Sequence, residues 1–141
     1  MFYLDTSAFV PLYAAEKSSA KLDAWLNKFG SAVFISEWTA TEFYSALGLK
    51  VRMRELSRQQ ALAAMAAFNL DLRTSWNIVT PTASDYRRAC DYLARLDTGL
   101  RSGDALHLAI AKNHDAKSIV SLDKNLIKAA HKLDIPAQVP I

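Results

Sequence analysis

The sequence predicts a single α/β domain with a central, mostly parallel sheet of four to five strands flanked by helices. The chain has 141 residues, which is enough for one hydrophobic core. Its 51% hydrophobic and 22% charged residues favour a folded chain over a disordered one. Short apolar segments rich in β-formers alternate with helical segments, as in parallel α/β sheets. Since no Gly- or Ser-rich linker divides the chain, we expect one domain over residues 1–141.

Five segments are expected to form strands. Four are short and rich in β-branched or aromatic residues, and each ends at a polar residue or a proline. The fifth lies in a tail with two prolines, which favour an edge position. The expected strands are Phe2–Leu4, Val33–Ser36, Trp76–Thr80, Ser118–Leu122 and a part of Ile135–Ile141.

Helices are expected between these strands. Thr6 and Ser7 offer N-cap chemistry for a short first helix, with Pro11 tolerable only in its first turn. The later helices are expected from Ser18 or Ser19 to Phe29, Glu37 to Leu56, Ser57 to Leu70, Thr82 or Ser84 to Leu96, Asp104 to Asn113, and Asp123 to Leu133. The periodicity assigns core positions to Leu62, Met65 and Leu70, and to Ala89, Leu93 and Leu96. The helix from Asp104 is apolar on nearly every side, which is typical of a buried helix.

Composition excludes several classes of protein. Cys90 is the one cysteine, so an internal disulfide framework and a CxxC zinc site are excluded, and we expect a reducing, cytoplasmic setting. The longest stretch without Asp, Glu, Lys or Arg is the twelve residues Gln59–Leu70, too short to span a bilayer. Asp5 interrupts the first apolar run, so we expect no secretory signal and no membrane partner. The net charge of +3 is compatible with a nucleic-acid partner without requiring one.

Four acidic residues stand at junctions between the expected elements. Asp5 and Asp123 follow strands, whereas Asp104 and Glu42 lie on helices. Ligands of such sheets bind at the carboxyl ends of the strands, near a switch in strand order, so the four acids could converge there. Clustered carboxylates repel one another, and Mg²⁺ or Mn²⁺ removes the penalty. Metal ions held by carboxylates suit phosphodiester hydrolysis by activated water.

Simpler interpretations exist for each residue alone. Asp5, Asp104 and Asp123 are each most simply helix N-caps or partners of the helix dipole. Glu42 alone is most often a solvated helix residue. His107 lies three residues after Asp104, but a packed core histidine is the commoner case. Cys90 is expected to be buried, the basic run 50–58 to be a solvated helix face, and three aromatic residues to pack in the core rather than stack on a base: Trp38, Tyr44 and Trp76.

Four motifs that follow one another along the chain favour a functional site over these simpler interpretations. They are Leu4-Asp5-Thr6-Ser7, Ser36 with Glu42 six residues on, Ser102-Gly103-Asp104-Ala105-Leu106-His107-Leu108-Ala109, and Ser121-Leu122-Asp123. Together they resemble the PIN-domain ribonucleases, most closely the VapC-type toxins of bacterial toxin–antitoxin pairs. The resemblance covers nearly the whole chain. One departure is Gly103, where larger residues are common in the family, and it puts the shape of the loop in doubt.

The resemblance implies a role for each matched residue. Asp5 and Asp104 are the surest Mg²⁺ (or Mn²⁺) ligands, and Asp123 completes the site directly or through water. Glu42 positions or deprotonates a metal-bound water. Ser7 and Ser121 match small polar positions that support the carboxylates. Arg101 matches a position that is often basic and contacts RNA phosphate.

The same resemblance implies the biological activity. We expect a metal-dependent endoribonuclease that acts as a toxin, a homodimer, and a cognate antitoxin that inserts a segment, with an Arg or Lys, into the acidic groove. Two alternatives stay open: a PIN nuclease without a toxin role, and a catalytically silent PIN module that binds RNA or a protein. No Ser or Cys stands in a recognisable nucleophile–base motif, so we expect no covalent nucleophile.

Overall fold

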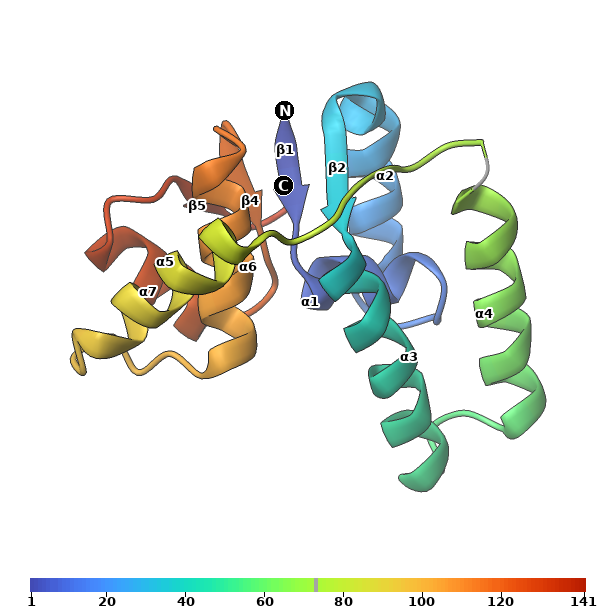
Figure 1. Ribbon diagram of the computed structural model, residues 1–141. Coiled ribbons are helices and arrows are strands. Elements are labelled where there is room, and N and C mark those ends of the chain that lie inside the picture. Colours follow the sequence, from blue (N-terminus) through green and yellow to red (C-terminus); the bar gives the residue numbers. More distant parts are fainter. Residues whose placement is uncertain (73) are drawn as a thin grey trace.

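Five parallel strands form one sheet in the order β3-β2-β1-β4-β5 (Figure 1). The structure is a computed structural model and describes residues 1–72 and 74–141. The strands are β1 Phe2–Leu4, β2 Val33–Ser36, β3 Asn77–Val79, β4 Ser118–Val120 and β5 Ala137–Gln138. The predicted α/β class with a parallel sheet is therefore confirmed, and the strand expected in the tail forms at the edge beside β4.

The strand order reverses at β1. From β1 the chain moves to β2 and β3 on one side, and then crosses to β4 and β5 on the other. Leu4 is paired with Val120, and the Asp5 amide donates to the Val120 carbonyl at 3.2 Å. The residues that follow β1 and β4 therefore lie side by side, at the switch point where such sheets bind their ligands.

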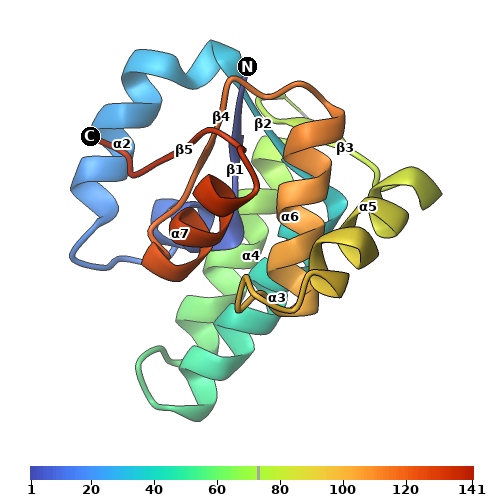
Figure 2. The ribbon, with the colours of Figure 1, turned by 90° about the vertical axis from the view of Figure 1, so that its left-hand side faces the viewer.

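Helices cover both faces of the sheet (Figures 1 and 2). The first face carries α1 Thr6–Phe9, α2 Ser19–Phe29, α3 Glu37–Arg52 and α4 Arg58–Leu72, with 3-10 turns at Val10–Leu12 and Gly30–Ala32. The second face carries α5 Ala83–Ala94, α6 Ser102–Asn113 and α7 Lys124–Lys132. Among the described residues, no helix combines the length and the hydropathy needed to cross a bilayer.

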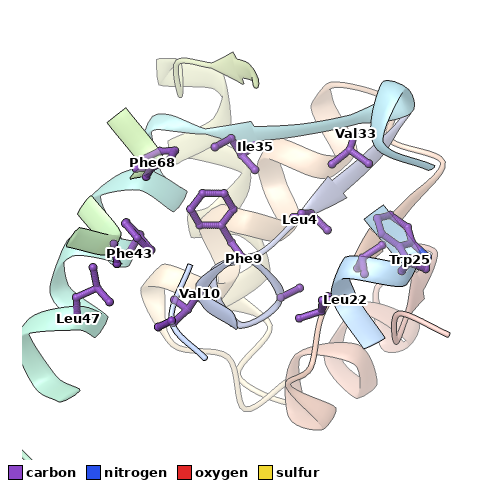
Figure 3. Packing of buried hydrophobic residues seen from close by; sticks show 14 of the residues in the cluster. Leu4, Phe9, Val10, Leu22, Trp25, Val33, Ile35, Phe43, Leu47 and Phe68 are labelled. Atoms are coloured by element: carbon purple, nitrogen blue, oxygen red, sulfur yellow. The ribbon is translucent and has the colours of Figure 1, made fainter. Parts of the chain in front are cut away.

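The core on the first face is organised around Phe9 (Figure 3). Its ring is fully buried and packs edge-on against Phe43 of α3, Phe68 of α4 and Trp76, with centroids 5.0 to 5.3 Å apart. Such aromatic pairs add to the stabilisation from burial alone. Because Phe9 ends α1, this packing also holds the segment that follows Asp5 against α3.

The core on the second face is built on α6, which is buried from Ala105 to Ala111, as its all-round apolar pattern predicts. A polar clamp joins α5 to its far end. The buried Asp85 carboxylate accepts from the Thr82 amide at 2.8 Å and from the Asn113 side-chain amide at 2.7 Å. The contact caps α5 and fixes its first turn against the last turn of α6.

The first helix is capped by Asp5, whose carboxylate accepts from the Ala8 amide. This confirms the simpler interpretation of Asp5, and the N-cap is neither Thr6 nor Ser7. Pro11 is the second residue of the 3-10 turn Val10–Leu12, which follows α1. Asp5 has the extended backbone that a cap requires, since it continues directly from β1.

Three leucines at expected core positions, and Cys90, lie at the surface instead. On α4, Leu62 and Leu70 are 50% and 68% exposed, and the core face consists of Ala61, Ala64 and Phe68. This helix is apolar on several sides, so its periodicity could not select the buried face. Leu96 is 90% exposed because α5 ends at Ala94, and Cys90 is exposed because its neighbour Ala89 takes the buried position.

Candidate active site

Asp5 lies at the floor of the site, directly after β1, with only 3% of its surface exposed. Its Oδ1 accepts from the Ser7 hydroxyl at 2.7 Å and from the Ala8 amide at 3.0 Å. Its Oδ2 accepts from the Ser121 hydroxyl at 2.6 Å. Burial raises the pKa of Asp5, while the attraction of His107 and these hydrogen bonds oppose the rise. The carboxylate is thus held in one orientation.

Ser7 and Ser121 join the ends of β1 and β4. Their hydroxyls lie 3.1 Å apart, and each also accepts a backbone amide, Ser7 from Leu122 and Ser121 from Asp123, at 2.9 Å. Each hydroxyl donates its one proton to Asp5 and accepts one backbone amide, so the two serines contact each other without a proton between them. The two serines therefore link Asp5 to the loop that presents Asp123.

Glu42 reaches the same region from α3, nearly two turns after β2 ends. Its Oε1 accepts from the Thr6 hydroxyl at 2.6 Å and bonds to His107 Nε2 at 2.5 Å. Burial acts to raise the pKa of Glu42, but the hydrogen bond and charge of His107 and the Thr6 hydroxyl outweigh it and hold the pKa below its usual value. Glu42 is therefore ionised near neutral pH and able to accept a proton.

His107 contacts a candidate site residue. It is 2% exposed, as expected of a core histidine, and it connects Glu42 to the interior through Tyr3, whose hydroxyl lies 2.7 Å from its Nδ1. The prediction that His107 packs in the core is thus confirmed, and the structure adds its contact with Glu42. The signal in the sequence was its position three residues after Asp104, which places the two side chains as neighbours on the helix.

Asp104 and Asp123 complete the set of acids. Asp104 lies in the first turn of α6 and is half-buried, and no described residue donates a hydrogen bond to its carboxylate. Asp123 caps α7, with its Oδ1 accepting from the Asn125 and Leu126 amides. Burial raises the pKa of Asp104, and the charge of Asp123 raises it next, with smaller contributions from Asp5 and Glu42. All four acids therefore share one electrostatic environment.

The donor set fits a hard divalent cation. In residues 1–72 and 74–141, no three His, Cys, Asp or Glu side chains are already grouped as metal ligands. However, the donors are carboxylate oxygens, which Mg²⁺ and Mn²⁺ prefer, and Asp104 has free oxygens. The mutual repulsion that raises the pKa of Asp104 is the penalty that a bound cation relieves.

A groove next to Asp123 is bordered by α1, α3 and the loop after β4. It has a volume of about 360 Å³, and its lining residues are Thr6, Ser7, Val10, Glu16, Ala46, Lys50, Leu122 and Asp123. Lys50 belongs to the basic run 50–58, and its ammonium pairs with Glu16 at 2.5 Å and with Glu55 at 3.4 Å. Arg101 is exposed at the N-cap of α6, three residues before Asp104. The charge of Lys50 is therefore balanced by two carboxylates, whereas Arg101 is an exposed positive group near Asp104.

The three aromatic residues have different environments. Trp76 packs against Phe9 and donates to the Tyr13 hydroxyl, as expected for a core residue. Trp38 is half-buried, and its Nε1 donates to the Gly103 carbonyl at 3.3 Å, which places it beside the site. Tyr44 is exposed on α3 and bonds to Asn69, so the expectation of core packing is wrong for Tyr44.

Comparison with protein families identifies this architecture. The family described as "PIN domain" matches residues 2–132, and the chain belongs to this family. PIN domains are typically nucleases that use divalent metals. The comparison with curated proteins gives no match by sequence.

Several solved structures share the fold. VapC20 from Mycobacterium tuberculosis, a toxin that cleaves the sarcin–ricin loop, aligns with a TM-score of 0.73 and 21% identity over 92% of this chain and 95% of that chain. FitAcB from Neisseria gonorrhoeae aligns with a TM-score of 0.69 and 20% identity over 99% and 98%. A toxin–antitoxin complex from Klebsiella pneumoniae aligns with a TM-score of 0.69 and 16% identity over 100% and 98%.

Proposed function

We propose that this protein is a Mg²⁺- or Mn²⁺-dependent endoribonuclease that acts as a toxin neutralised by a cognate antitoxin. The observation that carries the proposal is the placement of four acids at one edge of the sheet: Asp5 after β1, Glu42 against His107 of α6, Asp104 in the first turn of α6 and Asp123 after β4. Burial raises the pKa of Asp104, and the charge of Asp123 raises it next, as expected for neighbouring carboxylates. Four acids that interact at the switch point of a PIN fold provide the oxygen donors for phosphodiester hydrolysis.

Asp5, Asp104 and Asp123 would hold the metal. When bound, it supplies a Lewis acid that lowers the pKa of water and stabilises the leaving oxygen. Asp5 offers a carboxylate already oriented by Ser7 and Ser121. Asp104 offers oxygens that accept no hydrogen bond from the described residues. Asp5 would therefore be a rigid ligand of the metal, and Asp104 an adaptable one.

Glu42 would act as the general base. Its lowered pKa leaves it ionised, and its Oε1 is already bonded to Thr6 and His107. Oε2 is then the atom that orients the attacking water and takes its proton. Ser7 and Ser121 act as supports, because each hydroxyl is fixed between the Asp5 carboxylate and a backbone amide.

RNA would enter along the groove that borders α3. Lys50 lies on its rim, one turn after Ala46 and two after Glu42. We assign it a phosphate of the RNA strand beside the cleaved bond, which would replace Glu16 and Glu55 as its partner. Arg101 would contact a phosphate on the side of α6. Both contacts are electrostatic and independent of sequence.

An antitoxin would inhibit the enzyme by charge complementarity. An inserted Arg matches paired carboxylates with two parallel hydrogen bonds, and the unpaired Asp104 is the natural acceptor. The neighbour from K. pneumoniae was crystallised as a toxin–antitoxin complex, which supports a partner of this kind.

We further propose that the protein is a homodimer and that it acts in the cytoplasm. Light scattering on the purified protein tests the dimer directly.

The test of the activity uses antitoxin-free protein and a mixed RNA pool that includes a sarcin–ricin loop oligonucleotide. Wild type is compared with Asp5→Asn, Asp104→Asn and the exposed Asp91→Asn on α5, in Mg²⁺, Mn²⁺ or EDTA, after circular dichroism has verified each fold. We expect wild type and Asp91→Asn to cleave only with metal, and the other two variants to be inactive.

Four other results would contradict the proposal. Cleavage in EDTA, or by both site variants, would show that the acids do not carry the reaction. An intact wild type that binds RNA but cleaves none would favour the catalytically silent PIN module. Cleavage without growth arrest on expression in bacteria would favour a PIN nuclease that is not a toxin.

A further inference from the structure

We propose that His107 and Gly103 form a seat on α6 that positions Glu42, the general base of the proposed nuclease. His107 holds one oxygen of the carboxylate, and Gly103 leaves the space that the other oxygen occupies. The inference rests on the proposed function for its catalytic consequence. The contact itself is a property of this chain's own residues and can be measured without activity.

The contact with His107 is directional. A carboxylate only accepts hydrogen bonds, so Nε2 must carry the proton that faces Glu42 Oε1 at 2.5 Å. The Tyr3 hydroxyl lies 2.7 Å from the other ring nitrogen and 2.8 Å from the Ser36 hydroxyl. Because both ring nitrogens are hydrogen-bonded and the ring is buried, the imidazole cannot rotate. It therefore holds the Glu42 carboxylate in one orientation.

The contribution of Gly103 is steric. A Cβ atom at this position would lie 2.9 Å from Glu42 Oε2, closer than real contacts allow, and 3.4 Å from the Trp38 ring. Trp38 is itself tied to the Gly103 carbonyl. Because Glu42 is the more flexible neighbour, a larger residue at 103 would displace its carboxylate and leave the fold intact. The small residue at this position therefore has a functional reason.

The two positions work as a unit because they are one helical turn apart. Residues i and i+4 share a face of a helix, so Gly103 and His107 lie one above the other beneath Glu42. Asp104 belongs to the same first turn. The seat thus fixes the general base relative to a proposed metal ligand through a single rigid helix.

The first test compares variants in steady-state cleavage of an RNA that wild type cuts. We expect His107→Gln to lower kcat about 10- to 100-fold with KM unchanged, as for other residues that orient catalytic groups. Gly103→Ala should also lower kcat while the Tm stays equal or rises, because Ala is the better helix former. The matched controls are His131→Gln on α7 and Gly48→Ala on α3, where a Cβ meets only the Arg52 side chain at 3.4 Å.

A double-mutant comparison separates positioning from a merely structural role. If His107 acts through Glu42, His107→Gln should cause no further loss of kcat in a Glu42→Gln background. Equal losses of kcat in both backgrounds would overturn the proposal, as would wild-type kcat in Gly103→Ala.

The second test does not depend on cleavage. NMR of the protein labelled with ¹⁵N at histidine should show a His107 Nε2–H proton that exchanges slowly and is shifted far downfield. Glu42→Gln should move it upfield, since a neutral amide is the weaker acceptor. A signal that does not respond overturns the seat, whatever the enzyme cuts. A signal that responds in a wild type that cleaves no RNA supports the seat and overturns the proposed function.

Discussion

The Ser121 hydroxyl, one residue past β4, donates a 2.6 Å hydrogen bond to Oδ2 of Asp5, one residue past β1. The two residues are 116 positions apart in the chain and adjacent in the sheet. This bond joins the two strands between which the strand order reverses, and it orients the most deeply buried of the four acids. The site therefore depends on the pairing of β1 with β4 as much as on its carboxylates.

Removal of this hydrogen bond should destabilise the protein. In Ser121→Ala, Oδ2 of Asp5 stays buried without its donor, and we expect a loss of about 1–3 kcal/mol in the free energy of unfolding. Urea denaturation at neutral pH measures it. The control is Ser118→Ala on the same strand, because the Ser118 hydroxyl is also buried but bonds only to the neighbouring Ile119 carbonyl. A loss as large in the control would show that the Asp5 contact contributes nothing special.

Neutralising Asp104 should stabilise the metal-free protein. Its pKa is raised, so the folded state holds a proton that the unfolded state releases, and the stability due to Asp104 falls as pH rises from the unfolded pKa through the folded one. Asp104→Asn removes this penalty. We therefore expect its Tm in EDTA to exceed that of wild type at pH 7, and the difference to vanish below about pH 4.

Addition of Mg²⁺ should reverse that order. A ligand that binds only the folded state stabilises it by about 2.7 kcal/mol at a hundred times its Kd. Wild type and Asp91→Asn should gain Tm with Mg²⁺, and Asp104→Asn should gain much less. An equal gain in all three would place the cation elsewhere.

The buried face of α4 can be tested with two residues two positions apart. Phe68 is fully buried beside Phe9, and Leu70 faces solvent. We expect Phe68→Ala to cost about 3–5 kcal/mol and Leu70→Ala less than about 0.5 kcal/mol beyond helix propensity. Chemical denaturation of both variants measures the difference. A large loss in Leu70→Ala would mean that α4 is rotated, or that Leu70 lies in a subunit interface.

Lys50 should contribute to RNA affinity through charge alone. In an Asp104→Asn background, which prevents cleavage, Lys50→Gln should weaken binding and reduce the slope of log K against log salt by about 1. Lys50→Arg should keep the slope. The exposed Lys112→Gln on α6 is the control, and a salt slope unchanged in Lys50→Gln would remove Lys50 from the RNA path.

Much of the fold could be predicted because its signals are local. Phe2–Leu4 and Val33–Ser36 form strands with the predicted bounds, since short runs of β-formers end at residues that cap the next helix. The burial of α6 followed from an apolar pattern that leaves no polar face. Asp5 and Asp123 stood at strand ends in the sequence, and parallel pairing brings such ends to one edge of the sheet.

Other features depend on residues far apart in the chain. The periodicity of α4 fits both Leu70 and Phe68, and only packing against Phe9 selects the buried face. His107 and Glu42 are 65 positions apart, so no local pattern could show that the histidine seats the glutamate, or that Gly103 makes room for it. The sequence specifies which elements form, because propensity and periodicity act over a few residues. Contacts between elements determine which side chains meet, because burial and hydrogen bonding depend on the whole packed chain.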